Sequence, residues 1–384
     1  MWSPPPNPPL LNAAHYYAVM GATVRWSEAL AWRMRRQFMA GTGAPTAEDI
    51  VGRLVAVPSW SGDADVVVGV RLADPQPRAV ADAFSDGLLI KTFAFRGSMN
   101  YFTPQDAGIY LALRAGARQW ERKSWREFYR LNPAAWLGFR ETVRDALASG
   151  PLTQRELADV VVRDARFAHL HAALTDKSCT LLKPLAWQGD LSLALPRDGG
   201  LTLQSPTAVS GWSGIPELED AGPQAIRAYL AAYGPASAEH LQYWLGEGLS
   251  AGRNRIAGWI SRMLADEIVT VNVDGDELLV LAEDADELMS QRASPMVRLL
   301  PGLDPWILGP GTADQRVVPS DRRTEITRGA NPVIVDGRVA GTWKIVKNVL
   351  TVSTHAGALS RDGLDAERAR LAKVLGRELD LDGG

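Results

Sequence analysis

Two carboxylates, Asp63 and Asp65, lie in a Ser-Gly-Asp-Ala-Asp stretch just before an apolar run that is typical of a helix. A carboxylate that faces a cavity can hold and deprotonate a water molecule, which is the chemistry of a general base in hydrolysis. Aspartate is also favoured at helix N-termini, because its side chain accepts backbone N–H groups and its charge suits the helix dipole. The two residues are therefore candidates for a hydrolytic base or for helix caps.

Ser59 and Trp60 come just before these carboxylates. An aromatic side chain at such a position can stack on a base that has left a DNA duplex, or wedge between base pairs. It can also be a buried packing anchor, since the chain has 13 tryptophans and most of them must fill the core. We treat Ser59 and Trp60 as candidate DNA contacts, with packing as the alternative for the tryptophan.

Basic residues cluster in two stretches of the sequence. Such clusters can bind DNA phosphates and supply affinity that does not depend on base sequence. They can also be solvated helix faces with internal ion pairs, and several acidic residues accompany the first cluster. The clusters are Arg114, Arg118, Arg122, Lys123, Arg126, Arg130, Arg140 and Arg144, and Arg25, Arg33, Arg35 and Arg36. The DNA contacts predicted from them are Arg33, Arg36, Arg122, Lys123 and Arg126.

Histidine and cysteine give no sign of a metal centre. His169 and His171 have a spacing that can bind metal on a strand, but no third ligand stands near them in the sequence, and a helix surface is the simpler interpretation. Cys179 is the only cysteine, so it can form no disulfide within the chain. We expect neither a metal nor a cofactor.

Composition indicates a globular protein of the cytoplasm, associated with the nucleoid if it binds DNA. Hydrophobic residues make up 46% and charged residues 22%, while the net charge is −3. A basic DNA face must therefore arise from local clustering. The proline-rich start lacks the basic and apolar pattern of a secretory signal, and no apolar run reaches the roughly 20 residues that span a bilayer. We expect a monomer without membrane contact.

An internal repeat in the sequence indicates which helices and strands carry the candidate residues. The sequence Gly150-Pro151-Leu152-Thr153 precedes a helical pattern, and Gly234-Pro235-Ala236-Ser237 precedes another. Each places a Thr or Ser where its hydroxyl can cap the next helix, and Pro45-Thr46 is a weaker third copy.

A β-hairpin pattern follows each of the two strong copies. Leu191 to Leu203 and Val269 to Leu281 both alternate with period two around a turn, and Asp274-Gly275 is a strong hairpin signal. A further amphipathic helix precedes each copy, and a helical stretch, Ala168 to Ala186 in the first copy, precedes each hairpin. The order helix, helix, helix, hairpin is that of a winged helix.

The sequence thus predicts an α+β protein with three tandem winged-helix units and a C-terminal β-rich segment. In the first unit, helices are expected near 27–39, 46–57 and 64–71, with strands at 89–95 and 99–102. In the last segment, a β-meander over 333–353 and a helix over 364–379 are expected, with an irregular, mobile loop at 309–331. The predicted boundaries are 1–22 (proline-rich segment), 23–132, 133–216 and 217–294 (winged helices), and 295–384.

Three basic residues occupy places where a winged helix meets DNA. Arg253 and Arg255 open the third helix of the third unit, which normally enters the major groove. Arg197 stands at the tip of the second unit's hairpin. In a tandem array some units pack on each other instead, so packing is the alternative for each of these residues.

Six stretches, spread in one order over nearly the whole chain, carry a family resemblance. They are LAWRMRRQF from Leu30, TFAFRGSMNYFTP from Thr92, LLKPLAWQGDL from Leu181, YLAAYGPAS from Tyr229, LLPGLDPWILG from Leu299 and VDGRVAGTW from Val335. With them the chain resembles the AlkZ/YcaQ family of bacterial winged-helix DNA-binding proteins, some of which are DNA glycosylases that remove bulky or cross-linking alkyl adducts. The resemblance implies three winged helices around a basic channel for double-stranded DNA, with Arg96 among the DNA contacts.

The chain departs from that family at the residues that carry its chemistry. Glycosylases of the family have Gln-x-Gln or Gln-x-Asp just after the second helix, where this chain reads Pro58-Ser59-Trp60. The family's usual His after Arg-Gly-Thr is replaced by Asn100. Two hypotheses follow: a repair protein of the alkylpurine glycosylase type that acts on alkylated or distorted DNA, or a non-catalytic DNA-binding or transcription-regulatory protein on the same fold.

Overall fold

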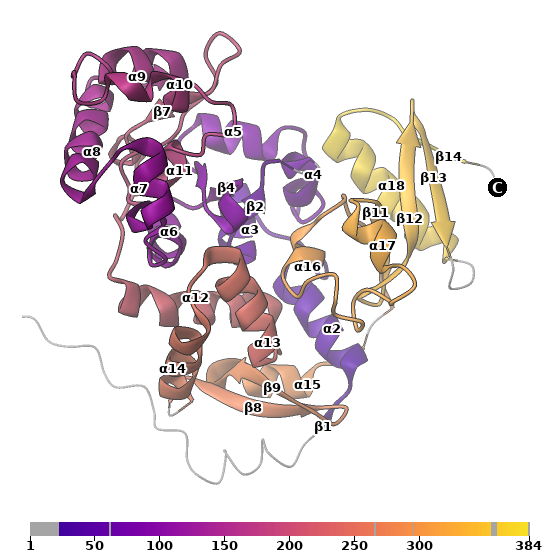
Figure 1. The fold of residues 1–384 in the computed structure, drawn as a ribbon. Coiled ribbons are helices and arrows are strands. Elements are labelled where there is room, and N and C mark those ends of the chain that lie inside the picture. The colour runs from indigo at the N-terminus through magenta and orange to yellow at the C-terminus, as the bar shows by residue number, and fades with distance from the viewer. Residues whose placement is uncertain (1–22, 61–62, 265, 294, 355–358, 383–384) are drawn as a thin grey trace, which may run out of the picture.

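The computed structural model describes residues 23–60, 63–264, 266–293, 295–354 and 359–382, and the predicted proline-rich segment 1–22 lies outside them. Helices and strands are mixed along the described chain, which confirms the α+β class. The described strands form sheets of six, five and three strands (Figure 1).

The six-stranded sheet joins parts of the chain that were predicted to belong to the first and second units. Its strand order is β2-β4-β3-β6-β7-β5. Lys91 of β3 pairs antiparallel with Leu193 of β6, and this pairing connects the hairpin predicted for the first unit with the hairpin predicted for the second. The strands are β2 (Val57–Pro58), β3 (Ile90–Phe93), β4 (Met99–Phe102), β5 (Leu152–Thr153), β6 (Ser192–Leu193) and β7 (Thr202–Gln204).

Three short helices pack on one another beside this sheet. Thr46 caps the first of them by accepting the Asp49 backbone N–H, as the Pro-Thr signal predicts. The third helix, which follows Pro77, was not predicted. These helices are α3 (Ala47–Leu54), α4 (Ala64–Gly69) and α5 (Ala79–Ser85), and they are followed by η1 (Phe95–Gly97), α6 (Ala107–Ala115), η2 (Gln119–Glu121) and α7 (Lys123–Tyr129).

Helix α2 (Trp26–Arg36) lies where the sequence did not place it. It was expected to pack within the first unit, but it contacts α12 and α15, which lie within the residues predicted for the third. Leu30 and Met34 are buried with residues of the C-terminal segment, while Trp32 is buried in the cluster around β8 and β9. The reason is that α2 buries side chains on more than one side, so its local hydrophobic pattern does not reveal which elements it packs against.

Both predicted hairpins are confirmed, and each is preceded by a series of helices. The stretch 168–186 is not one helix, because Asp176 forms a turn with the Ser178 N–H and Cys179 has a left-handed backbone (φ 54°). The first set of helices is α8 (Pro133–Leu147), α9 (Gln154–Val161), η3 (Ala168–Leu170), α10 (His171–Leu174) and α11 (Leu182–Trp187), with η4 (Pro206–Ala208) after the hairpin. The second set is α12 (Leu218–Tyr233), α13 (Ala238–Leu241), η5 (Gln242–Glu247) and α14 (Arg253–Met263), followed by β8 (Ile268–Val273), β9 (Asp276–Leu281), η6 (Ala282–Asp284) and α15 (Ala285–Ser290).

The third sheet is held partly by the start of the described chain, since β1 (Thr23–Val24) pairs parallel with β8. The C-terminal segment carries the predicted meander and helix. Residues 309–331 were expected to be an irregular loop, but they include a helix and bury Val317, Val318 and Ile326. The elements are β10 (Val297–Leu299), α16 (Pro305–Leu308), α17 (Arg323–Thr327), β11 (Asn331–Val335), β12 (Arg338–Val346), β13 (Val349–Thr354), α18 (Arg361–Leu375) and β14 (Asp380–Leu381). None of the described helices combines the length and apolar character needed to cross a membrane.

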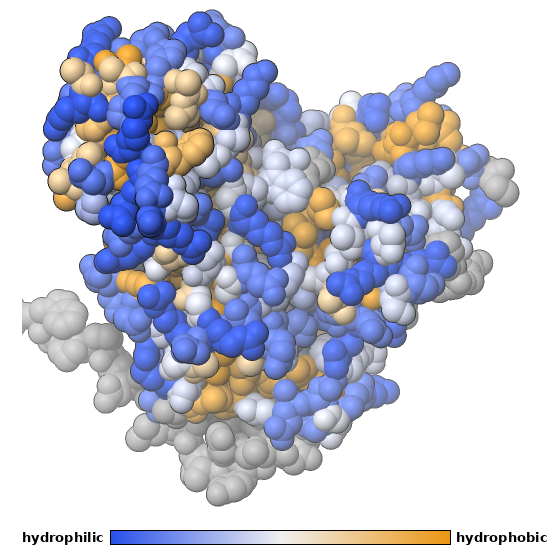
Figure 2. Space-filling view, in the orientation of Figure 1, coloured by the Kyte–Doolittle hydropathy of each residue, from blue (hydrophilic) through white to orange (hydrophobic). Residues whose placement is uncertain are grey.

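The molecular surface is hollowed on one face. In Figure 2 it recedes between the lobe formed by α7 to α10 and the lobe formed by the C-terminal sheet with α18. The elements at the centre of this face include β2, β4 and α16 (Figure 1).

Candidate functional site

A cavity that opens to solvent lies where β2 and β4 of the central sheet meet α16 and the π-helical turn η5. Its walls are mostly apolar and aromatic, and a few polar groups interrupt them, as is usual for ligand sites. The lining residues are Ala56, Pro58, Trp60, Phe95, Arg96, Ser98, Asn100, Tyr233, Trp244, Gly248, Pro305, Leu308 and Gly309.

Strand pairing places Trp60 at this cavity. Pro58 pairs with Asn100, and Ser59 donates both its backbone N–H (3.1 Å) and its hydroxyl (3.2 Å) to the Met99 carbonyl. Trp60 follows directly after the last of these bonds and is 54% exposed. The packing alternative for this tryptophan therefore does not hold, because a core anchor would be buried.

The turn between β3 and β4 places Arg96 at the same cavity. Arg96 and Gly97 both have positive φ (51° and 70°), which lets the chain reverse within the hairpin. Ser98 donates its hydroxyl to the Phe95 carbonyl (2.7 Å) and closes the turn. The Arg96 guanidinium lies 4.7 Å from the ring centre of Tyr243, a cation–π contact that holds the side chain in place.

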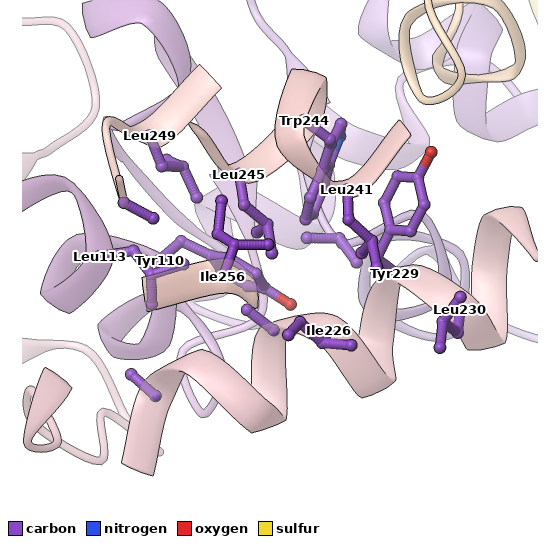
Figure 3. Packing of buried hydrophobic residues seen from close by; sticks show 14 of the residues in the cluster. Tyr110, Leu113, Ile226, Tyr229, Leu230, Leu241, Trp244, Leu245, Leu249 and Ile256 are labelled. Atoms are coloured by element: carbon purple, nitrogen blue, oxygen red, sulfur yellow. The ribbon is translucent and has the colours of Figure 1, made fainter. Parts of the chain in front are cut away.

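An aromatic cluster supports the part of the cavity wall that Phe95 and Trp244 form. Trp244 lies 4.6 Å from Phe95 and 5.0 Å from Tyr229, measured between ring centres. In Figure 3, Trp244 of η5 lies between Leu245 and the ring of Tyr229 of α12, within the buried cluster that joins these helices to α14. No local pattern predicts the role of Trp244, because η5, β4 and α16 come together around the cavity only in the folded chain.

The two predicted carboxylates act as helix caps. Asp63 accepts the backbone N–H of Asp65 (2.9 Å) at the start of α4. Asp65 accepts the backbone N–H groups of Val80 (2.7 Å) and Ala81 (3.2 Å) at the start of α5. Burial raises the pKa of Asp65, and these two hydrogen bonds oppose the shift. Neither carboxylate lines the cavity, so the expected catalytic role finds no geometric support.

The side chains that do line the cavity hold no carboxylate within the described part of the chain. Their polar groups are the Arg96 guanidinium, the Ser98 hydroxyl, the Asn100 carboxamide and the hydroxyl of Tyr233. Tyr233 donates to the Leu54 carbonyl (2.8 Å), and burial raises its pKa well above the ordinary value, so it stays neutral. The site can therefore orient a ligand by stacking and hydrogen bonding, but it offers no strong base.

The arginines Arg33 and Arg36 of α2 form hydrogen bonds and ion pairs inside the protein. Arg33 is 1% exposed and donates to the carbonyls of Gly234 (3.4 Å) and Pro235 (3.1 Å). Arg36 donates to the Ala231 carbonyl (3.2 Å) and forms an ion pair with Asp284 (3.1 Å). The prediction that Arg33 contacts DNA is wrong, because its guanidinium lies inside the protein. Arg36 is largely occupied in the same way.

The cluster around α7 is partly free. Lys123 lies 3.8 Å from Glu127, and Arg118 lies 3.5 Å from Glu121. Arg140 and Arg144 share the buried Asp190, while Arg114 stacks on Trp187. Within the described residues, no carboxylate lies within 4.0 Å of the guanidinium groups of Arg122, Arg126 or Arg130.

The remaining predicted contacts are exposed and differ in their partners. Arg253 is exposed at the first position of α14, and Arg255 is exposed with weak bonds to the carbonyls of Gly116 (3.5 Å) and Ala251 (3.3 Å). Arg197 forms an ion pair with Glu156. The structure does not bring these three arginines to the cavity, since none of them lines it.

The histidine pair makes ordinary structural contacts. His169 hydrogen-bonds the Tyr129 carbonyl (3.0 Å), and His171 bonds Asp159 (3.0 Å). Among the residues that the structure describes, no group of three His, Cys, Asp or Glu side chains is arranged to hold a metal ion.

Comparison with known proteins identifies the class of this fold. The family model described as DNA glycosylase AlkZ-like matches residues 51–374. The chain belongs to this AlkZ-like family.

A curated relative and a solved structure agree with that assignment. The chain is 36% identical over 361 residues to the "Interstrand DNA cross-link repair glycosylase" of Streptomyces sahachiroi, and the match covers 91% of this chain and 96% of the relative. The solved structure of Streptomyces sahachiroi DNA glycosylase AlkZ superposes with a TM-score of 0.87 at 34% identity, covering 94% of this chain and all of that one.

Proposed function

We propose that this protein binds double-stranded DNA and receives a modified nucleotide in the cavity beside Trp60. The observation that carries the proposal is the exposed indole of Trp60 at a cavity that also presents Arg96 and Asn100. An exposed aromatic ring can stack on a base that has left the duplex, while a guanidinium favours a phosphate nearby. The curated relative is named for the repair of cross-linked DNA, which favours alkylated or cross-linked DNA as the ligand.

We further propose that the protein uses tandem winged helices to grip the duplex. The sets α8 to β7 and α12 to β9 each have the element order of a winged helix, and α3, α4, α5 with β3 and β4 form a third such set. Arg122 and Arg130, which are exposed and have no acidic partner among the described residues, are available to bind phosphates.

Excision of the base should be slow. Removal of one preorganised polar group from an active site commonly costs about 10²–10³ in rate. Pro58, Ser59 and Trp60 supply no polar pair like that of the family glycosylases, and Asp63 and Asp65 are occupied as caps. We therefore infer that the protein retains DNA binding, while its release of N7-alkylguanine is very slow or undetectable.

The alternative function is a non-catalytic binder or transcription regulator, which the absence of a carboxylate from the described cavity walls favours. A regulator would bind unmodified duplex as tightly as modified duplex and would prefer a particular sequence. A lesion-binding protein would prefer modified DNA of any sequence.

A fluorescence anisotropy titration with N7-methylguanine, cross-linked and unmodified duplexes separates these functions. Trp60→Ala should lose the preference for modified duplex, because stacking of one base is worth about 1–3 kcal/mol, and should bind unmodified duplex as before. Phe128→Ala is the control, since Phe128 is 77% exposed but lies outside the cavity. Equal affinity of the wild type for all duplexes would contradict the proposal.

A further inference from the structure

A row of small polar side chains crosses the central sheet and ends at the cavity. Asn100 of β4 is paired with Thr92 of β3. The antiparallel register that pairs Lys91 with Leu193 places Ser192 of β6 opposite Thr92. Asn100, Thr92 and Ser192 are therefore cross-strand neighbours on three adjacent strands. Asn100 is the member of this row that lines the cavity.

The three side chains share the face of the sheet that is covered by the largest apolar cluster. Alternate residues of a strand point to the same face, and Ile90 and Phe102, two positions from Thr92 and Asn100, belong to that cluster. The neighbours of Ser192 on either side pack in the cluster on the opposite face. Thr92, Asn100 and Ser192 are 0%, 2% and 1% exposed.

Each member of the row has a side-chain oxygen without a hydrogen-bond partner among the described residues: Thr92 Oγ1, Asn100 Oδ1 and Ser192 Oγ. The indole Nε1 of Trp187, which is buried in the same cluster, is also without a partner there. Buried polar groups in native proteins are nearly always bonded to protein or to ordered water. Three such oxygens in one cross-strand row point to a common set of partners.

We propose that this row binds a chain of internal water molecules and that Asn100 presents the outermost water to the cavity. Pro58, which stands in the family's catalytic stretch, is the next residue across the sheet and pairs with Asn100. The water site therefore lies beside the position where family glycosylases carry their polar motif. Water binding by the row is independent of DNA, whereas its use in hydrolysis rests on the proposed function.

The outermost water is the nucleophile available to a nucleotide in the cavity. Its oxygen forms a bond to the sugar C1′ while the bond between C1′ and the base breaks. N7-alkylguanine carries a positive charge before cleavage, so it leaves with the bonding electron pair as a neutral base. The attacking water releases its proton to solvent on the open side of the cavity, where Trp60 is exposed. Asn100 holds the nucleophile but cannot deprotonate it, because a carboxamide is not basic. The row thus explains why hydrolysis would be possible but slow.

The water sites can be tested without DNA. Thr92→Val removes the hydroxyl and keeps the shape of the side chain. If the hydroxyl bonds water, the melting temperature falls; if it has no partner, removal of an unsatisfied polar group raises the melting temperature. A high-resolution crystal structure should show water within hydrogen-bond distance of Thr92 Oγ1 and Ser192 Oγ. Absence of those waters together with a raised melting temperature would overturn the proposal.

The position of the outermost water can be tested by introducing a carboxylate that can act as a general base on it. Asn100→Asp has almost the same shape and places a carboxylate on that water. Single-turnover release of N7-methylguanine should then be at least about tenfold faster than in the wild type, since a well-placed base contributes about 10²–10⁴. Ser98→Asp is the control, because Ser98 lines the same cavity outside the row and bonds the Phe95 carbonyl.

The outcomes distinguish the two proposals. Faster release by Asn100→Asp but not by Ser98→Asp supports the water site at Asn100. No acceleration in an Asn100→Asp protein that folds and binds the modified duplex like the wild type contradicts it. If no variant prefers modified duplex, the proposed function fails, while the crystallographic waters and the Thr92→Val melting temperature still decide whether the row binds water.

Discussion

Helices α2 and α7 look alike in the sequence and differ completely in the folded protein. Both belong to arginine-rich stretches with scattered acidic residues. On α2, Arg33 is buried on backbone carbonyls and Arg36 is paired with Asp284. Beside α7, Arg122 and Arg130 are exposed without an acidic partner among the described residues. The number of arginines in a stretch of sequence therefore does not tell whether their guanidinium groups are bonded within the protein or are free to bind a ligand.

The physical cause of the difference is what each helix packs against. Helix α2 lies between α12, α15 and the C-terminal segment, so its polar side chains must find partners in the interior. Helix α7 is covered on one side through Trp125 and Tyr129, and the rest of its surface is in contact with solvent. A buried guanidinium needs hydrogen bonds to offset its loss of hydration, whereas an exposed one does not.

The largest expected effect is on stability, from Arg33→Met. This change removes a buried charge that donates to Gly234 and Pro235 and lies near the buried Asp314. The two buried carbonyls then lose their donor, and each unsatisfied group costs about 1–3 kcal/mol, so we expect the free energy of unfolding to fall by about 2–6 kcal/mol. Denaturant unfolding measures this change, and the DNA affinity of the folded fraction should not change.

Arg35→Ala is the matched control on the same helix. Arg35 is 43% exposed and pairs with Glu287 (2.5 Å), so its loss should cost at most about 1 kcal/mol. If Arg33→Met is as mild as Arg35→Ala, burial does not separate the two arginines and the comparison of α2 with α7 loses its basis.

Local signals predicted elements well and their partners poorly. The hairpin at 268–281 follows from Asp274-Gly275 between alternating strands, and the start of α9 follows from the capping box of Thr153 and Glu156. The contact of β1 with β8 joins Thr23 to Asn272. No local pattern encodes a pairing over that separation, nor the single sheet that joins two predicted units.

The candidate site shows the same division. Trp60 and Arg96 were named from the sequence and lie at one cavity. Asp63 and Asp65 were named as possible bases or caps, and their hydrogen bonds make them caps. A capping aspartate and a catalytic aspartate have the same local sequence, because the difference lies in which backbone N–H groups come within reach after folding.

The second prediction extends the comparison from arginines to carboxylates. Asp65→Ala should lower the free energy of unfolding by about 1 kcal/mol, because α5 loses its acceptor, whereas Asp65→Asn can still accept and should cost less. Burial raises the pKa of Asp65 in the folded state, so folding favours its protonated form. The wild type should therefore gain stability relative to Asp65→Asn as the pH falls toward the ordinary range of aspartate.

Paired thermal melts from neutral to acid pH measure this difference. Neither variant should change the rate of base release in a single-turnover assay. If Asp65→Ala lost base release at unchanged stability, Asp65 would be a catalytic carboxylate. It would then belong with the charged groups that are available to a ligand, and not with those that stabilise the fold.

The smallest effect is expected from Arg122→Ala combined with Arg130→Ala, and it concerns DNA affinity alone. Both side chains are exposed, so stability should change by less than about 0.5 kcal/mol. Each phosphate contact that is lost should weaken binding to modified and unmodified duplex alike and lower the slope of log affinity against log salt by about 1.

The matched control is Arg118→Ala combined with Lys123→Ala, which removes the same charge from residues that already pair with Glu121 and Glu127. Because those cations are partly neutralised, the control should retain most of the wild-type slope in anisotropy titrations at several salt concentrations. Equal losses in the two double variants would mean that only net charge matters, and an unchanged slope in both would mean that α7 is a solvated face that DNA does not reach.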